Sequence, residues 1–305
     1  MLSVEVESVR TLRFDDGAPV RAASGVAPLG GGWLVAQDDA AHAAWLRDGS
    51  VERVRVVPSI EGYDLFSSAA GTKHLKPDLE AACAVEHDGR PGVLLLGSGS
   101  TPARMRAALV TLEDQPQVVL ADLSPLYAQV ARVLERDPDQ LNLEGACRAG
   151  EVLRWFARGN LAAGVASASV EVDLGPLMGA VTGRSDPADV PVRRPLTYDL
   201  GQVQGVGLTV TDAVALADGR VLLSAAAEDT PNAVDDGPVV ASALALVDGD
   251  DLISTVPLPE VDGRVAKVEG LAVLDQDPDR VRLLAVVDED DVEAASTCLV
   301  LQVRL

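Results

Sequence analysis

Residues 80–97 read EAACAVEHDGRPGVLLLG, and this stretch contains the pattern that decides the fold. A short apolar segment comes first, the tight-turn pair Asp88-Gly89 follows, and a second apolar segment runs from Val93 to Leu96. An Asp-Gly pair between two apolar runs is among the strongest short-range signals for a β-hairpin. The stretch therefore predicts two antiparallel strands, with the charged residue Glu80 at the start of the first strand.

The same pattern recurs about every 60 residues, which is a spacing typical of repeated supersecondary units. Each of the five copies opens with one polar residue before a short strand, and these residues are Ser24, Glu80, Glu144, Asp212 and Glu269. A turn and a second apolar strand follow in every copy, and further apolar segments supply third and fourth strands. Four antiparallel strands per repeat describe a propeller blade. The sequence predicts an all-β fold, a five-bladed β-propeller of four-stranded antiparallel blades.

The two ends of the chain predict how the ring closes. Too few residues follow Glu269 for four strands, whereas residues 4–9 alternate apolar and polar with a period of two. We therefore expect the N-terminal strand, within residues 3–14, to complete the last blade. The whole chain, residues 1–305, is expected to be one propeller domain, because two sheets packed face to face would not explain five phased repeats. The expected blades cover approximately residues 22–66, 78–122, 142–205, 208–262 and 267–305.

Two segments depart from the blade pattern. Ser124-Pro125 predicts a helix N-cap followed by proline at the first helical position, and Pro138 should end that helix. Residues 175–195 are rich in Gly, Pro and Arg, and they are expected to form a long loop within the third blade.

The composition excludes several classes of function. Acidic residues outnumber basic ones 47 to 25, for a net charge of −22, whereas a nucleic-acid-binding protein needs a basic face. Anionic membrane surfaces are disfavoured for the same reason. No apolar run reaches the roughly 18 residues of a membrane span, and the N-terminus lacks the features of a signal peptide. Three cysteines without a CxxC pair fit a reducing compartment. We expect a cytoplasmic protein that binds neither nucleic acid nor membranes.

Strand order predicts that polar residues gather at one mouth of the central channel. In a four-stranded meander the first strand begins at the end where the second strand finishes. The five opening residues should therefore lie beside the residues that end the second strands, among them Arg158, Glu228 and Asp288. Loops held by a rigid scaffold often carry function, so this mouth is the expected site.

The five opening residues are candidate metal ligands. Carboxylates converging on a narrow channel raise one another's pKa values, and a hard cation with oxygen ligands would relieve that cost. Ca²⁺ accepts six to eight such ligands. The alternative is a water-filled polar pore whose glutamates bond to backbone N–H groups. Zinc is not expected, because the three histidines fall on different blades or faces and no thiol pair exists. The candidate metal ligands are Ser24, Glu80, Glu144, Asp212 and Glu269.

Other polar residues around the mouth are candidates for ligand binding and catalysis. Basic side chains could clamp an anion or form salt bridges to the ring glutamates, and the acidic segment 228–237 could bind a second cation or a sugar hydroxyl, or be a solvated turn. Glu144 or Asp288 would be the general base, and Arg158 would stabilise developing negative charge. The candidate ligand-binding residues are Lys76, Arg104, Asn160, Glu228, Asp229, Asn232 and Asp236.

Several longer motifs carry a resemblance to known proteins. The segments KPDLEA at 76–81, LNLEGA at 141–146 and EDTPNAVDDG at 228–237 resemble an uncharacterised family of bacterial β-propellers, and this resemblance spans nearly the whole chain. More distantly, the polar ring resembles the central calcium site of the five-bladed calcium-activated nucleotidases (apyrases), which implies a bound calcium. In that family the fourth blade offers a hydroxyl residue, whereas here Asp212 or its neighbour Thr211 must serve. The segment that begins at Glu269 also resembles the esterase-like phytase propellers.

The sequence therefore predicts a calcium-centred propeller that acts as a hydrolase on a small phosphorylated or sugar-like molecule at the channel mouth. The alternative is a non-catalytic propeller that binds a metabolite or a protein and holds a structural cation. A small-molecule ligand is expected in the first case and is one of the two partners in the second.

Overall fold

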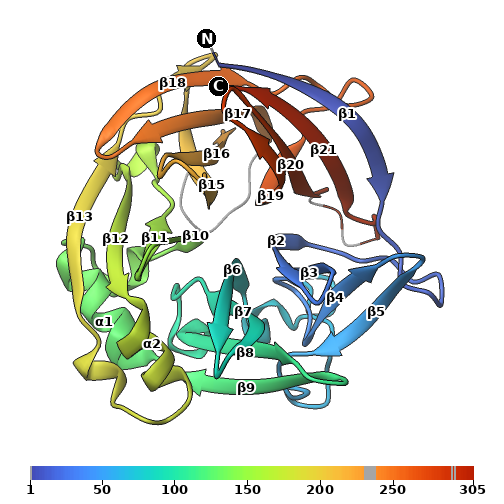
Figure 1. The fold of residues 1–305 in the computed structure, drawn as a ribbon, viewed down its shortest axis with the longest axis vertical. Helices are drawn as coiled ribbons and strands as arrows, with labels where there is room; N and C mark the ends of the chain where they lie inside the picture. Colours follow the sequence, from blue (N-terminus) through green and yellow to red (C-terminus); the bar gives the residue numbers. More distant parts are fainter. Residues whose placement is uncertain (1, 230–237, 290, 292) are drawn as a thin grey trace.

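The chain is a five-bladed β-propeller in a computed structural model that describes residues 2–229, 238–289, 291 and 293–305. Five antiparallel sheets surround a central axis, and each presents its first strand to the axis (Figure 1). Each blade is a four-stranded meander, and the fourth blade has one additional short strand.

The first three blades follow one another along the chain. Blade 1 comprises β2 (Ala23–Leu29), β3 (Gly32–Gln37), β4 (His42–Arg47) and β5 (Ser50–Arg55). Blade 2 comprises β6 (Leu79–His87), β7 (Arg90–Gly97), β8 (Arg106–Leu112) and β9 (Pro116–Asp122). Blade 3 comprises β10 (Leu143–Ala149), β11 (Val152–Ala157), β12 (Ser167–Asp173) and β13 (Val192–Tyr198).

The last two blades complete the ring. Blade 4 comprises β14 (Gln202–Val203), β15 (Val206–Ala215), β16 (Val221–Glu228), β17 (Val239–Asp248) and β18 (Asp251–Pro257). Blade 5 comprises β19 (Lys267–Asp277), β20 (Arg280–Asp288), β21 (Thr297–Arg304) and, as its outermost strand, β1 (Ser3–Thr11).

The N-terminal strand closes the ring, as the sequence predicted. Strand β1 pairs antiparallel with β21, with Ser3 opposite Arg304 and Thr11 opposite Thr297. The two ends of the chain therefore lie side by side at the top of Figure 1. Glu7 of β1 also forms an ion pair with Arg282 of β20, with the nearest atoms 2.7 Å apart. An outer strand contributed by the opposite end of the chain joins the first blade to the last.

Two helices lie on the outer side of the ring. Helix α1 (Ser124–Val133) confirms the predicted helix, although Leu123, and not Ser124, occupies the N-cap position. The prediction of a long loop at 175–195 is wrong, because this segment contains most of α2 (Leu174–Val181) and the start of β13. Leu177 and Val181 of α2 are buried four residues apart, and Pro176 lies in the first turn, where a missing N–H is tolerated.

Five short 3₁₀ turns join the elements. They span Lys73–Leu75, Pro102–Arg104, Pro138–Gln140, Leu161–Ala163 and Pro187–Asp189. No helix among the described residues is long and apolar enough to cross a membrane.

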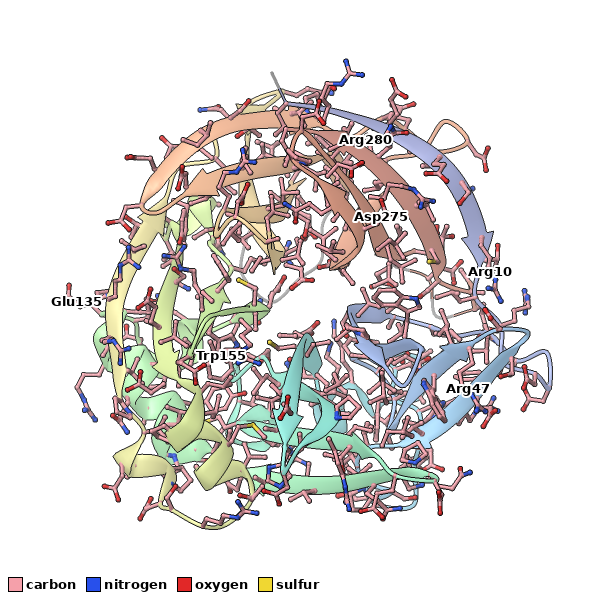
Figure 2. The ribbon with its side chains drawn as sticks, viewed as in Figure 1. Arg10, Arg47, Glu135, Trp155, Asp275 and Arg280 are labelled. Carbon is pink, nitrogen blue, oxygen red and sulfur yellow. The ribbon has the colours of Figure 1, made fainter. Side chains whose placement is uncertain are left out.

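Apolar side chains fill the spaces between the blades, and most of them are Leu, Val and Ala. The scarce aromatic residues are placed where the volume to be filled is large. Trp155 is fully buried and meets the ring of Tyr127 from α1 edge-on, with ring centroids 4.9 Å apart. Figure 2 shows Trp155 well inside the ring, whereas Arg10 and Glu135 lie at its outer rim. The blades thus form a rigid frame that positions the inner strands.

Candidate functional site

Each of the five inner strands contains a β-bulge at the same place. The pairing register with the second strand shifts across one residue in β2, β6, β10, β15 and β19. A bulge re-aims the side chain of the extra residue. The five bulge residues, which we call the ring, are Ser24, Glu80, Glu144, Thr211 and Glu269.

The structure corrects the phase of the repeat in blade 4. Thr211 occupies the bulge, and Asp212 occupies the next position, which is Gly25, Ala81, Gly145 and Gly270 in the other blades. The repeat read from the sequence placed Asp212 at the position of the ring glutamates, and this put blade 4 one residue out of register. Such a slip matters because successive residues of a strand point in opposite directions. The ring therefore consists of three carboxyl groups and two hydroxyl groups.

The two hydroxyl groups of the ring are oriented in the same way. Ser24 Oγ donates to the carbonyl oxygen of Leu79 at 2.5 Å, and Thr211 Oγ1 donates to the carbonyl oxygen of Val268 at 2.6 Å. Each acceptor is the residue just before the ring glutamate of the next blade. Because the Ser24 proton is used in this bond, its oxygen lone pairs remain available as acceptors, whereas Thr211 Oγ1 also lies 2.9 Å from the hydroxyl of Ser224.

Three blades are linked by a chain of alternating charges. Glu144 accepts hydrogen bonds from Asn142 at 2.6 Å and from Arg158 at 3.2 Å. The guanidinium of Arg158 also lies 2.7 Å from Glu228. Lys267 Nζ then lies 3.0 Å from both Glu228 and Glu269. Two basic side chains therefore bridge three carboxylates across blades 3, 4 and 5.

A second charged cluster occupies the side of the mouth formed by blades 1 and 2. Lys76 Nζ lies 2.5 Å from Asp38 and 2.5 Å from Asp78, and Arg104 lies 3.0 Å from Asp78. Asp38, Asp78 and Glu80 have carboxylate oxygens within 4.8 Å of one another, and no other group of three acidic side chains in the described ranges does so. Within those ranges, the carboxylate of Glu80 has neither a hydrogen bond nor an ion pair.

Burial in this crowded mouth shifts the pKa values of its carboxyl groups. Burial raises the pKa of Glu269 to about 8, although Lys267 opposes the shift. Burial also raises the pKa of Glu80 well above its usual range, and Asp38 and Asp78 raise it further. Burial would raise the pKa of Glu228 too, but Arg158 and Lys267 together hold that pKa below its ordinary value. The pKa values of carboxyl groups in the mouth are therefore shifted in both directions, a combination that is typical of functional sites.

Asp212 lies directly after the ring on strand β15 and is fully buried. Its Oδ2 accepts a hydrogen bond of 2.7 Å from the backbone N–H of Leu271 in the next blade, while its Oδ1 has no partner among the described residues. Burial raises the pKa of this carboxyl group well above its usual range.

The remaining candidates from the sequence are distributed around this centre. Arg104 lies at the mouth and also donates to Ser100 at 2.8 Å. Asn160 accepts from the N–H of Ala163 and so caps a 3₁₀ turn. Asp229 is exposed just beyond the end of β16. Asp288 ends β20 opposite Lys267 in the strand register, and Asn232 and Asp236 lie outside the described residues.

Several residues of the site are absent from the candidates that the sequence suggested. Lys267, Asp78 and Asn142 each lie two positions before a ring glutamate. Side chains two residues apart on a strand point to the same side, so this spacing could have identified them. The local sequence does not indicate a site residue at Lys267, because it lies between apolar residues at the start of a strand.

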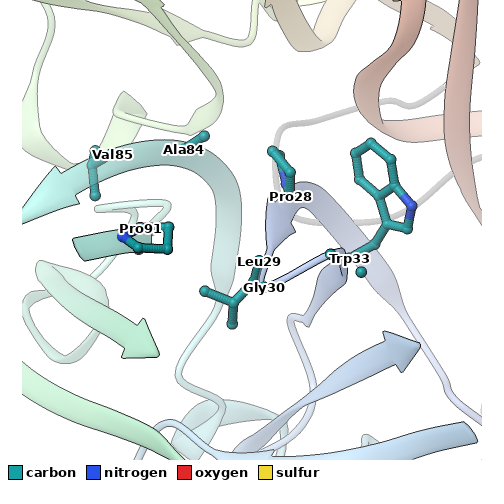
Figure 3. Close-up of a pocket in the computed structure, with 10 residues that line it drawn as sticks. Pro28, Leu29, Gly30, Trp33, Ala84, Val85 and Pro91 are labelled. Carbon is teal, nitrogen blue, oxygen red and sulfur yellow. The ribbon is translucent and has the colours of Figure 1, made fainter. Parts of the chain in front are cut away.

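A separate cavity of about 390 Å³ lies at the opposite face, between the first hairpins of blades 1 and 2 (Figure 3). Its lining is mainly apolar and includes Leu29, Trp33, Val85 and Pro91, together with the glycines of the β2–β3 turn. None of the ring residues lines this cavity. It is therefore distinct from the charged mouth.

The chain matches the model of one protein family, and solved structures with a similar outline exist. Residues 72–292 match the sequence model of a family described as a family of unknown function (DUF6910). No curated protein matches the chain.

Solved structures with a similar outline have low sequence identity. A hypothetical protein from Leishmania major has a TM-score of 0.49 at 12% identity, with 97% of this chain and 90% of that chain covered. The α-L-arabinofuranosidase from Podospora anserina has a TM-score of 0.49 at 10% identity, with 97% and 94% covered. The GH43 endo-arabinanase from Bacillus licheniformis has a TM-score of 0.42 at 12% identity, with 95% of each chain covered. Similarity at this level says nothing about activity.

Proposed function

The chain belongs to this family of unknown function, and we propose that it is a cation-centred propeller that hydrolyses a small phosphorylated or sugar-like molecule at the channel mouth. The observation that supports the proposal best is the composition of the ring. Five bulges bring three carboxyl groups and two acceptor hydroxyl oxygens to one level of the channel.

The ring offers oxygen donors of the kind that a hard cation binds, and we propose Ca²⁺, which would have to draw together three ring carboxyl groups whose oxygens do not all lie within 4.8 Å of one another. All five ring side chains offer oxygen, which is the ligand atom that Ca²⁺ prefers. The Ser24 hydroxyl donates to a backbone carbonyl, Thr211 Oγ1 bonds to the Val268 carbonyl and to Ser224, and Asp212 adds a buried carboxyl oxygen without a partner in the described structure. The proposed ligands are Ser24, Glu80, Glu144 and Glu269, with Thr211 or Asp212 from blade 4.

The group formed by Asp38, Asp78 and Glu80 is a less suitable place for this cation. Lys76 already lies between the two aspartates, so its ammonium group would be close to an ion bound there. Like charges in close contact are unfavourable. Arg158 and Lys267 also contact ring glutamates, but the ring adds the hydroxyl oxygens of Ser24 and Thr211, and we therefore assign the proposed cation to the ring.

Named residues of the mouth would perform the remaining chemistry. A bound cation supplies a Lewis acid that polarises a substrate oxygen or lowers the pKa of a bound water. Glu144 is the proposed general base, and Asn142 and Arg158 orient its carboxylate. Asp288, at the end of β20, is the second candidate for the base. Arg158, Arg104 and Lys76 would stabilise negative charge that develops on the substrate.

A second candidate function is non-catalytic binding of a metabolite or a protein, with the cation in a structural role. The pairing of the basic residues favours it, because Lys76, Arg104 and Arg158 are each already bound to one or two carboxylates. A basic group held in this way has much of its charge neutralised before it can bind a reacting group.

A thermal unfolding experiment tests the cation. Calcium added after exhaustive chelation should stabilise the folded form by about 2.7 kcal/mol at a hundredfold excess over Kd. This should raise Tm by at least about 2 °C, and magnesium should have a smaller effect because it requires tight octahedral geometry. Glu144→Gln should remove most of the calcium effect. An unchanged Tm with chelator and with calcium would mean that the ring is a solvated pore lining.

An activity screen distinguishes the two functions. The intact protein would be incubated with phosphoesters, lactones and nucleotides, with and without calcium. Calcium-dependent turnover that is lost in Glu144→Gln supports the hydrolase, whereas a calcium-induced Tm shift without turnover of any compound supports the binding protein.

A further inference from the structure

We infer that the ligand of the mouth is a neutral polyol of the sugar class, and that it is not a phosphorylated molecule. The inference rests on the proposed function for the location of the site, and it chooses between the two substrate classes that the proposal leaves open. It is carried by the way in which the charges of the mouth are paired with one another.

Five basic side chains that the structure describes at the mouth are already bound to acidic ones, whereas Arg136 donates to the backbone carbonyls of Arg158 and Ala166. Lys76 lies between two aspartates, Arg158 lies between two glutamates, and Lys267 lies between two glutamates. Two further arginines are paired in the same way, Arg104 with Asp78 and Arg21 with Asp39. A phosphate group needs charged donors of this kind. To bind here without a metal, it would have to take them from buried carboxylates, which would then be left without partners.

Acceptor groups exceed donor groups at the mouth. Seven carboxyl groups lie among these five basic side chains, and Glu80 is the one without an ion pair in the described ranges; the seven are Asp38, Asp39, Asp78, Glu80, Glu144, Glu228 and Glu269. Asp39 is more than nine-tenths buried, and its Oδ1 has no hydrogen-bond partner in the described ranges. A buried acceptor without a donor is costly. The complementary ligand is therefore one that donates hydrogen bonds, which hydroxyl groups do and a phosphate dianion does not.

The paired charges also suit hydroxyl groups geometrically. An ammonium group beside a carboxylate offers a donor and an acceptor next to each other, and each hydroxyl of a sugar is both acceptor and donor. Lys76 beside Asp38 is one such pair, and Lys267 beside Glu269 is another. A neutral polyol can bind both members of a pair without separating them.

The mouth contains this arrangement twice. In blades 1 and 2, the hydroxyl of Ser24 donates to the backbone carbonyl of the residue just before Glu80. Lys76 reaches back to Asp38, which directly follows the second strand of blade 1. In blades 4 and 5, the hydroxyl of Thr211 donates to the backbone carbonyl of the residue just before Glu269. Lys267 reaches back to Glu228, at the end of the second strand of blade 4. Two subsites of similar construction therefore flank the ring. Each of them offers a donor beside an acceptor to a ligand that has several hydroxyl groups, as a saccharide does.

Matched ligand pairs test the inference. Binding would be measured by saturation-transfer NMR and calorimetry, in the presence of chelator, for glucose and glucose 6-phosphate, ribose and ribose 5-phosphate, and myo-inositol and its monophosphate. At least one neutral compound should bind, and tenfold or more tightly than its phosphate. Lys267→Met should weaken that binding tenfold or more, and Lys267→Arg should restore part of it.

The control and the second variant separate this role from stability. Arg282 also binds two carboxylates, those of Glu7 and Asp275, but it lies near the β19–β20 turn, at the end of blade 5 away from the mouth. Arg282→Gln should therefore leave polyol binding unchanged. If Lys267→Met fails to fold, Asp38→Asn tests the opposite subsite with the same expected loss.

Two results would overturn the inference. One is a phosphate that binds as tightly as its neutral partner in chelator, and the other is the absence of binding by all three polyols at about 20 mM. Because the measurement contains no calcium and no turnover, it stays separate from the tests of the cation and of hydrolysis. Polyol binding without a calcium effect would reject the proposed cation and support this inference.

Discussion

His42 shows how strongly burial in this fold changes the chemistry of a single residue. The side chain of His42 is buried and packs against the ring of Phe14, with centroids 5.5 Å apart. Burial lowers the pKa of His42 to about 4, and the nearby Arg53 lowers it further. The histidine is therefore neutral in the folded protein at pH 7.

This shift predicts a pH dependence of stability with a definite sign. Between about pH 6.5 and pH 4 the unfolded chain binds a proton at His42 that the folded protein does not, so the free energy of unfolding falls as the pH falls. Discounted for partial solvent screening, the loss is roughly 1–3 kcal/mol. Chemical denaturation of the wild type and of His42→Phe at pH 7.5 and pH 4.5 measures it. The difference between the two proteins should change in favour of the variant at the lower pH, and a constant difference would contradict the assignment.

At the scale of the element, the inner strands approach one another so closely that side chains are excluded at some positions. A Cβ atom added to Gly145 of β10 would lie 2.7 Å from the Cα of Asp212 in β15. A Cβ added to Gly270 of β19 would lie 2.8 Å from the Cα of Gly25 in β2. Because both neighbours are backbone atoms, they cannot rotate away as a side chain would.

Gly145→Ala should therefore destabilise the propeller by roughly 1–3 kcal/mol or more, since the blades must move apart to admit the methyl group. Gly175→Ala in α2 is the matched control, because a Cβ there meets nothing within 4 Å. That control should be neutral or slightly stabilising, by up to about 1 kcal/mol. Urea unfolding of both variants makes the comparison, and equal stabilities would show that the inner strands can separate without cost.

At the scale of the whole molecule, the ring depends on a strand from the opposite end of the chain. Deletion of residues 4–9 removes most of β1 and exposes the edge of β21. An exposed strand edge pairs readily with other chains, so the truncated protein should melt at a lower temperature and should aggregate. Light scattering and thermal unfolding measure both effects.

Glu7→Gln is the control for this deletion. It removes the exposed ion pair with Arg282 and keeps the strand, and exposed pairs contribute little to stability. This variant should remain monomeric with nearly the wild-type Tm. A truncated protein that behaved in the same way would show that β1 is not needed for closure.

The sequence by itself determined the number of blades, the order of strands within each blade and the closing role of the N-terminal strand. These features follow from local chemistry, namely Asp-Gly turns, alternation with a period of two and the spacing of the repeats. The helix that begins near Ser124 follows from an equally local signal. The helix at Leu174–Val181 was missed because its Gly and Pro residues, which usually indicate a loop, fall within its first turn and its exposed side.

Only the tertiary structure decided which groups meet at the mouth. The register in blade 4 depends on a single bulge, and no local signal distinguishes Thr211 from Asp212 as the residue that it re-aims. The pairing of Lys267 with Glu228 joins residues about 40 positions apart on different blades. Sequence patterns are sensitive to what lies along a strand, whereas charge pairing depends on which strands the closed ring brings together. The polar mouth could therefore be predicted, but the pairing of its basic side chains with its carboxylates could not.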